Sequence, residues 1–344
     1  MSDYDEAVGL SYQTNANDIY SNSWGPNDDG QHLEGPHRLV LETFARYASL
    51  GRRGLGTIWV WAAGNGAHVG DNCGADGYVQ SPYTIAIGAL GSDGKRAFYS
   101  ESCAALMAVA PSSGARGTSA ITTTTLQGQC TDKFGGTSSA CPLAAGIIAL
   151  MLQKNPRLTW RDVQVLIAKH AVVIDATVND WSRNSRGFRH SHQYGFGLLK
   201  APELVQQAAT WTTLPPQKGF SSGRITVSHT IAADGTPTCA SHRFIRSEIT
   251  FVEHVLVRVY ARHPRRGQLR IRLKSPEGVT SVLLDARAPD EIAWNIGGHL
   301  FSSVRHFGEA SGDGEWILCV EDAVPGDAWG PGTLDAFEMA VFGH

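Results

Sequence analysis

The distribution of apolar residues divides the chain into two parts with different patterns. In the first part, apolar runs at residues 57–62, 83–90 and 107–110 alternate with segments that repeat apolar residues at helical spacing. This alternation predicts a parallel α/β sheet, in which ligands gather at the carboxyl ends of the strands. A stretch with two prolines at residues 211–216 then interrupts the pattern and indicates a domain edge.

Beyond this stretch the chain contains only short segments typical of strands. They lie at residues 255–260, 269–273, 281–284, 316–320 and 337–342. Several short strands in succession predict a β-sandwich. We therefore expect two domains, residues 1–212 and residues 213–344.

One apolar run without a charged residue extends from Leu143 to Leu152, and Pro142 precedes it as the first turn of a helix allows. We expect this helix to be buried, because it is apolar on all sides. Ser138 lies just before the helix or at its start, where unpaired N–H groups and the positive end of the helix dipole gather. That position suits a nucleophile whose attack creates an oxyanion. A lone serine before a helix is more often only an N-cap.

Composition and charge narrow the class of protein. The 344 residues are 42% hydrophobic and 18% charged, as in soluble globular proteins. The net charge of −3 gives no electrostatic argument for nucleic-acid binding. No apolar run reaches the ~18 residues of a spanning helix, and the first twenty residues do not have the pattern of a signal peptide.

Six cysteines are present, and their spacing matches no zinc-binding pattern. Cys73 and Cys103 lie in predicted loops and could pair. Cys141 and Cys319 lie within apolar segments, which is typical of buried thiols.

The segment around Ser138 carries a family resemblance. Residues 136–146 read GTSSACPLAAG, which resembles the active-serine segment of subtilisin-like proteases. The continuation at residues 147–150 and 158–162 resembles the kexin and furin branch, the proprotein convertases. Residues 311–316 and 332–334 resemble the P domain of that branch. The resemblance implies an incomplete subtilisin-like parallel-sheet α/β domain, followed by an all-β, jelly-roll-like sandwich.

The resemblance also implies roles for single residues. Ser138 would be the nucleophile of an endopeptidase that cleaves protein or peptide substrates after basic residues. Asn65, in a glycine turn after a predicted strand, would donate to the oxyanion, although an asparagine in a turn often serves only the turn. Asp28 and Asp76 would hold the arginine that precedes the cleaved bond.

Further acidic positions match a second pocket and a cation site. Glu6, Glu34 and Tyr78 match a pocket for an upstream basic residue, with glutamate at position 34 where aspartate is familiar. Taken alone, each loop acid is more often simply solvated.

Asp28, Asp71 and Glu101 match a Ca²⁺ site, for which oxygen ligands are suitable. Cys73 and Cys103 match a disulfide. Cys130 and Cys239 lack their usual partners, and family likeness suggests the secretory pathway, either the Golgi or secretion.

The catalytic base is the main departure from the family pattern. No His-Gly-Thr string occurs, and we assign none of His32, His37 and His68 as the base. His190 and His192 match a packing segment of the family. We therefore expect a chain that is truncated at its N-terminus, poorly stable and inactive by itself. The alternative is a catalytically dead module that binds basic peptides. An esterase is disfavoured, because the serine is not in a Gly-x-Ser-x-Gly elbow.

Overall fold

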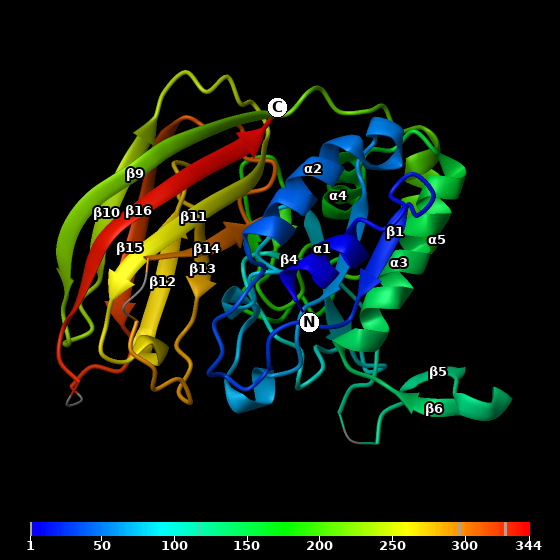
Figure 1. Cartoon of the computed structure of the whole chain (residues 1–344), viewed down its shortest axis with the longest axis horizontal. Coiled ribbons are helices and arrows are strands. Elements are labelled where there is room, and N and C mark those ends of the chain that lie inside the picture. The colour runs from blue at the N-terminus through cyan, green and yellow to red at the C-terminus, as the bar shows by residue number, and fades with distance from the viewer. Residues whose placement is uncertain (1, 116, 295–296, 327–328) are drawn as a thin grey trace.

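The computed structural model describes residues 2–115, 117–294, 297–326 and 329–344. An N-terminal α/β part and a C-terminal β-sandwich lie side by side (Figure 1). The last helix of the first part ends at Ala209, and the first strand of the second part begins at Lys218. No helix within the described ranges is long and apolar enough to cross a membrane.

The first part is built on a parallel sheet with the strand order β1-β2-β3-β4. Its strands are β1 (Ile19–Asn22), β2 (Ile58–Ala62), β3 (Thr84–Leu90) and β4 (Leu106–Pro111). Its helices are α1 (Asp3–Leu10), α2 (Arg38–Gly54), α3 (Thr137–Lys154), α4 (Trp160–His170) and α5 (Ala201–Ala209). Because β2 and β3 are buried along their whole length, they can carry an uninterrupted apolar sequence.

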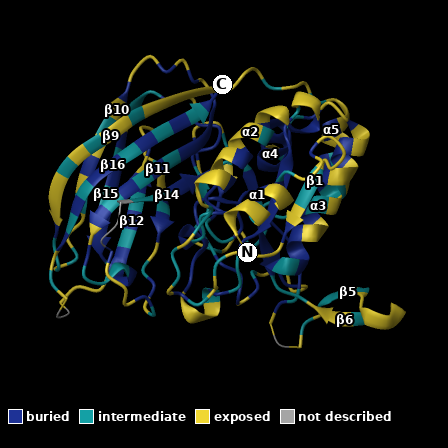
Figure 2. Ribbon diagram, in the orientation of Figure 1, coloured by how far each residue is buried: buried dark blue, intermediate teal, exposed yellow. Residues whose placement is uncertain are grey.

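Short elements complete this part. They are the 3₁₀ helices η1 (Ala67–Val69), η2 (Cys73–Ala75) and η3 (Leu126–Gly128), and the strand pairs β5 (Ile121–Thr124) with β6 (Cys130–Phe134) and β7 (Ser182–Arg183) with β8 (Arg189–His190). The β5–β6 hairpin projects from the body of the molecule and is largely exposed (Figure 2).

The second part is a sandwich of two antiparallel sheets, as the short strands predicted. One sheet has the order β10-β15-β12-β13 and the other the order β14-β11-β16-β9. The strands are β9 (Lys218–Ile231), β10 (Thr238–Phe244), β11 (Val252–Arg262), β12 (Leu269–Lys274), β13 (Thr280–Leu284), β14 (Gly297–Ser303), β15 (Gly314–Asp322) and β16 (Gly332–Gly343), with η4 (Arg266–Gln268) before β12. The inward side chains of both sheets form one apolar core.

Helix α3 differs from the helix that the sequence predicts. It begins at Thr137, so Ser138 is its second residue and Pro142 lies inside the helix. It is also not buried on all sides, because Leu143 and Leu150 are 39% and 47% exposed. The helix packs one face against β1–β4 and α5, and its opposite face carries apolar side chains toward the solvent.

The cysteines also differ from expectation. Cys73 and Cys103 form a disulfide. Cys239 is bonded to Cys319, so the expectations of an unpaired Cys239 and a buried Cys319 thiol are wrong. The antiparallel pairing of β10 with β15 places these two residues directly opposite each other. Cys130 is a free, exposed thiol, and Cys141 is free and buried.

Candidate active site

Ser138 lies at the start of α3, immediately after a tight backbone turn. Gly136 adopts a φ of +78°, which glycine tolerates at little cost. Because the helix begins at Thr137, the backbone N–H of Ser138 has no partner within the helix. The side chain of Ser138 is half-buried and lines a pocket. A hydroxyl beside a free N–H at a helix start is suitable for nucleophilic attack on a carbonyl.

Asn65 follows β2 and ties the helix start to the neighbouring loop. Its Oδ1 accepts hydrogen bonds from the N–H and hydroxyl of Thr137, at 2.8 and 3.0 Å. Its own N–H and its Nδ2 donate to Asp28 Oδ2, at 2.8 and 3.3 Å. A primary amide carries two protons, so the second proton on Nδ2 remains available to an oxyanion.

A chain of hydroxyl groups, which the sequence analysis did not predict, supports the turn before Ser138. The hydroxyl of Ser139 bonds with Ser112 Oγ, at 2.7 Å, and Ser112 Oγ bonds with Tyr99 Oη, at 2.9 Å. Tyr99 Oη also accepts from the N–H of Gly136. The segments are far apart in sequence, so no spacing could have revealed this network.

One small pocket brings four of the predicted site residues together. It has a volume of about 60 Å³ and is lined by Ser138, Asn65, Asp28 and Asp76 among others. Asp76 Oδ1 accepts from the N–H groups of Tyr78 and Val79, at 2.7 and 3.3 Å. Burial nevertheless raises the pKa of Asp76 to about 7, and burial also raises the pKa of Asp28.

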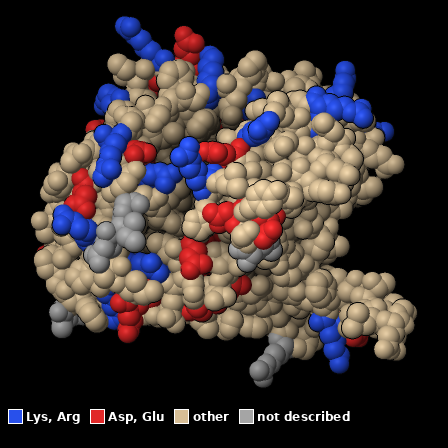
Figure 3. All heavy atoms as spheres, in the orientation of Figure 1, with Lys and Arg blue, Asp and Glu red and all other residues tan. Residues whose placement is uncertain are grey.

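A second, larger pocket of about 630 Å³ contains the three residues predicted to bind an upstream basic side chain. Glu6, Glu34 and Tyr78 line it, together with Asp3, which the sequence analysis missed. Tyr78 Oη donates to Glu6 Oε2 at 2.6 Å. Burial raises the pKa of Tyr78, and this hydrogen bond raises it further. Figure 3 shows acidic side chains gathered around α1 on this face. The only sequence signal for Asp3 is its place in the acidic first turn of α1.

Three carboxylates surround the Gly64–Gly66 turn. Asp28 accepts from Asn65, Glu101 Oε1 accepts from the N–H of Gly66 at 2.8 Å, and Asp71 Oδ2 accepts from the N–H of Gly30 at 2.8 Å. Burial raises the pKa of Glu101 well above its ordinary value, and the charges of Asp71 and Asp28 raise it further.

These three residues form an all-oxygen donor set whose charges repel one another, which is suitable for a hard cation such as Ca²⁺. Within the described ranges, no three acidic, histidine or cysteine side chains already form a group that could hold a metal ion. A cation would therefore have to draw the carboxylates closer together.

None of the described histidines lines the pocket of Ser138. His32 bonds with Asp29 at 2.7 Å, and His68 bonds with the carbonyl of Asn65 through Nδ1 at 3.1 Å. His190 and His192 are internal packing residues: Nε2 of the first contacts the carbonyl of Leu106, and Nε2 of the second accepts from the N–H of Val282. Burial lowers the pKa of both rings, which keeps them neutral. His37 lies at the edge of the larger acidic pocket.

Comparison with known proteins identifies two family models in the chain. The subtilase family model matches residues 1–197, and the model of the proprotein convertase P-domain matches residues 252–341. The chain is 41% identical to proprotein convertase subtilisin/kexin type 6 of Rattus norvegicus and 40% identical to furin of Homo sapiens. The whole of this chain is covered in both cases, with 37% and 43% of the respective relatives. The chain thus spans about two fifths of these relatives, and 19% of the type 5 convertase of Rattus norvegicus.

A solved structure shows the same fold. The serine protease of Aeromonas sobria, in complex with its chaperone, superposes with a TM-score of 0.89 at 23% identity. The superposition covers the whole of this chain and 74% of that protease. The α/β part and the sandwich that follows it therefore occur together in another protein.

Proposed function

The chain belongs to the subtilase family and carries a proprotein convertase P-domain. We propose that it supplies the nucleophile and the substrate pockets of a serine endopeptidase of the proprotein convertase type, which cleaves proteins or peptides after arginine or lysine. The observation that carries the proposal is the pocket in which Ser138, Asn65, Asp28 and Asp76 meet. A nucleophile, an oxyanion donor and two carboxylates around one small cavity are suitable for attack on a peptide bond beside a basic residue.

The proposed reaction assigns one role to each group at the helix start. Ser138 Oγ would attack the carbonyl carbon of the peptide bond while its proton passes to a histidine base, which the described lining of this pocket does not supply. That proton would then go to the amine nitrogen as the C–N bond breaks, which leaves an acyl group on Ser138. The N–H of Ser138 and the free Nδ2 proton of Asn65 stabilise the negative oxygen, an effect worth about 3–4 kcal/mol for one such donor. Asn65 is suited to this because its Oδ1 is held by Thr137, which fixes the direction of the amide.

Substrate selection follows from the acidic pockets. Asp28 and Asp76 would bind the basic side chain that precedes the cleaved bond through charge-assisted hydrogen bonds. The larger pocket, with Glu6, Glu34 and Tyr78, would bind a second basic residue upstream.

Asp28, Asp71 and Glu101 would hold Ca²⁺ next to the smaller pocket, where the ion would supply positive charge to a strongly acidic region. We place the protein in the secretory pathway. Two disulfides support this assignment, because such bonds persist in oxidising compartments.

We propose that the chain by itself does not cleave. The support is that no described histidine lines the pocket of Ser138, so the proton on Ser138 Oγ has no histidine acceptor there. The same observation favours a second candidate function, a module that binds basic peptides without cutting them.

Fluorophosphonate labelling and peptide binding separate these possibilities. The chain and Ser138→Ala would be labelled in the presence of calcium, and their affinity for an arginine-containing peptide would be compared with that for its citrulline analogue. Arginine-dependent binding without labelling is expected of this chain. Labelling that Ser138→Ala abolishes would show an activated serine and contradict the proposed inactivity. A folded chain that shows neither labelling nor arginine-dependent binding would refute both functions.

A further inference from the structure

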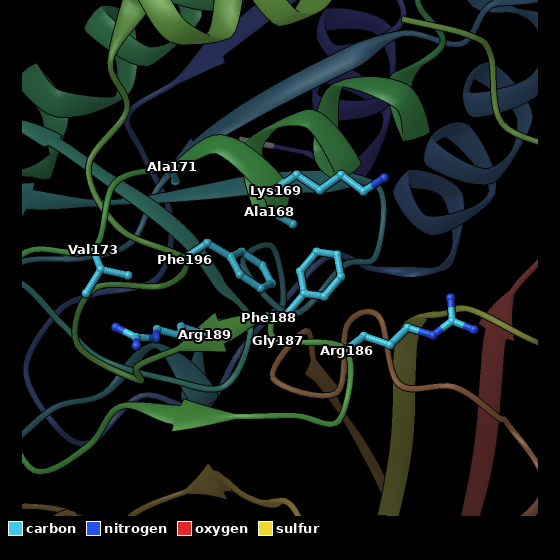
Figure 4. A pocket seen from close by; sticks show the side chains of 9 residues that line it. All are labelled: Ala168, Lys169, Ala171, Val173, Arg186, Gly187, Phe188, Arg189 and Phe196. Carbon is cyan, nitrogen blue, oxygen red and sulfur yellow. The ribbon is translucent and has the colours of Figure 1, made fainter.

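A third pocket, which shares no lining residue with the two acidic ones, opens between the end of α4 and the β7–β8 hairpin (Figure 4). We call it the Phe188 pocket; its lining residues include Ala168, Lys169, Arg186, Phe188, Arg189 and Phe196. Its volume is about 350 Å³, enough for one large side chain and its neighbours. Its apolar lining includes the partly exposed ring of Phe188, behind which the ring of Phe196 is buried, together with Ala168.

The charged residues that line the Phe188 pocket are all cations. Lys169, Arg186 and Arg189 line it, and no carboxylate does. None of the three forms an ion pair with a residue in the described part of the chain. Lys169 Nζ lies 4.9 Å from the centre of the Trp211 ring and Arg186 Cζ lies 5.8 Å from that of Phe251.

These ring contacts fix the positions of the Lys169 and Arg186 side chains, but they supply no anionic partner for the ammonium or the guanidinium group. In a chain whose net charge is −3, such a cluster is conspicuous. Arg183, from the same hairpin, adds a fourth cation next to Gly187.

The pocket is held in place from the second domain. Asn184, in the turn of the hairpin, donates from Nδ2 to the carbonyl of Phe307 at 2.7 Å and accepts from the N–H of Phe188 at 3.0 Å. The ring of Phe188 packs on those of Phe251 and Phe307, at 5.6 and 6.2 Å between centres. Because the hairpin is anchored by a buried amide and by aromatic packing, the cavity is formed before any ligand arrives.

The cations are spread too widely for one small anion. In Figure 4, the side chains of Lys169 and Arg186 extend to one side of the two phenyl rings and that of Arg189 extends to the other. A single carboxylate or phosphate can contact only one side of this arrangement. An extended chain can place an apolar side chain against the ring of Phe188 and carboxylates on both sides of it.

We propose that the Phe188 pocket binds an acidic peptide segment of a partner protein, anchored by an aromatic or large aliphatic side chain that packs against the accessible face of Phe188. The flanking carboxylates of the segment pair with Lys169 and Arg186 on one side and with Arg189 on the other. The site is independent of Ser138 and of the acidic pockets, whose charge selects the opposite kind of peptide.

The test measures fluorescence anisotropy with a labelled peptide in which one phenylalanine is flanked by two glutamates on each side. The chain should bind this peptide, and Arg186→Glu combined with Arg189→Glu should weaken binding about tenfold or more. Lys274→Glu, a charge reversal at an exposed position outside the pocket, should leave the affinity unchanged. Replacing the phenylalanine of the peptide by serine should weaken binding as well, because the anchor is lost.

Several results would overturn the proposal. The first is that the acidic peptide does not bind to a chain that still binds the arginine-containing peptide. The second is that the double variant and the wild type bind the acidic peptide with equal affinity. The third is that inorganic phosphate at similar concentration displaces the peptide. The last result would indicate a site for small anions only. The melting temperature of the double variant and its retained affinity for the arginine-containing peptide show that the chain remains folded.

Discussion

The titration of Asp76 should make binding of arginine-containing peptides strongly dependent on pH. A guanidinium group pairs with an ionised carboxylate, and burial raises the pKa of Asp76 to about 7 in the empty pocket. One pH unit below the pKa leaves about a tenth of the groups ionised, and two units leave about a hundredth. A bound guanidinium holds the carboxylate ionised, so below pH 7 binding must first expel a proton.

The ionised fraction of Asp76 sets the expected change in affinity for the peptide. In calcium-free buffer, the dissociation constant for the peptide should rise about tenfold between pH 8 and pH 6, and about tenfold again by pH 5. The raised pKa of Asp28 acts in the same direction. Asp76→Asn should bind more weakly at pH 8 and lose most of this pH dependence. Anisotropy titrations at each pH, with the citrulline peptide as a baseline, measure both quantities.

The stability of the chain gives an independent check on the same pKa. The folded pKa of Asp76 lies above the unfolded value of 3.8, so the folded state binds the extra proton between these two values. The contribution of Asp76 to the free energy of unfolding should therefore fall as pH rises from about 4 to 7, by at most about 4 kcal/mol, and then stay constant. Because the raised pKa values of Asp28 and Glu101 contribute falls of the same sign, Asp76→Asn should make the fall smaller without abolishing it, whereas the exposed control Asp132→Asn should retain it in full. A wild-type affinity that is equal at pH 8 and pH 5 would refute the reasoning.

Three further substitutions or additions test the rest of the structure. Arg161→Ala should lower the free energy of unfolding in urea by about 3–5 kcal/mol, because it leaves Glu253 buried without the guanidinium that bonds it at 2.8 Å. Replacing Cys239 and Cys319 by alanine should cost about 4 kcal/mol in the same assay, since their bond closes a separation of 80 residues. Calcium at a hundred times its dissociation constant should add about 2.7 kcal/mol, measured as a rise in melting temperature, and Glu101→Gln should reduce that rise.

Each of these tests has a matched control. Arg157→Ala changes an exposed arginine just before α4 and should have little effect. Cys141→Ala removes a free thiol and should not reproduce the loss caused by breaking the disulfide. Magnesium at the concentration used for calcium should stabilise less, because its smaller shell fits three spread carboxylates poorly. Equal effects of the test and control in any pair would contradict the corresponding assignment.

The strands of the α/β sheet could be predicted because a strand that is buried on both faces is apolar at nearly every position. The apolar runs at residues 57–62 and 83–90 became β2 and β3 with ends shifted by one residue. The extent of α3 could not be predicted in the same way. A uniformly apolar sequence does not say which face another element covers, and here Leu143 and Leu150 remain exposed.

The residues of the candidate active site also differ in how far the sequence predicted them. The place of Ser138 before a helix made it a candidate, but its choice as the nucleophile depended on the family resemblance. Its pairing with Asn65, Asp28 and Asp76 depended on that resemblance too, because their spacing in sequence carries no geometric information. Tyr99 and Ser112 left no signal at all. The bond between Cys239 and Cys319 depends on the register of β10 against β15, which the positions of the cysteines in the sequence do not determine.

The second domain contributes to the charge balance of the proposed substrate pocket. Arg287 is almost fully buried, and its Nη1 lies 3.3 Å from Asp71 Oδ1 while also donating to the carbonyl of His32. Asp71 is one of the carboxylates whose charge raises the pKa of Asp28 and of Glu101. A cation from the sandwich therefore offsets part of the repulsion that would otherwise oppose this acidic cluster. It also fixes the loop after Asp28, so the shape of the pocket depends on the docking of the two domains and not on the α/β part alone.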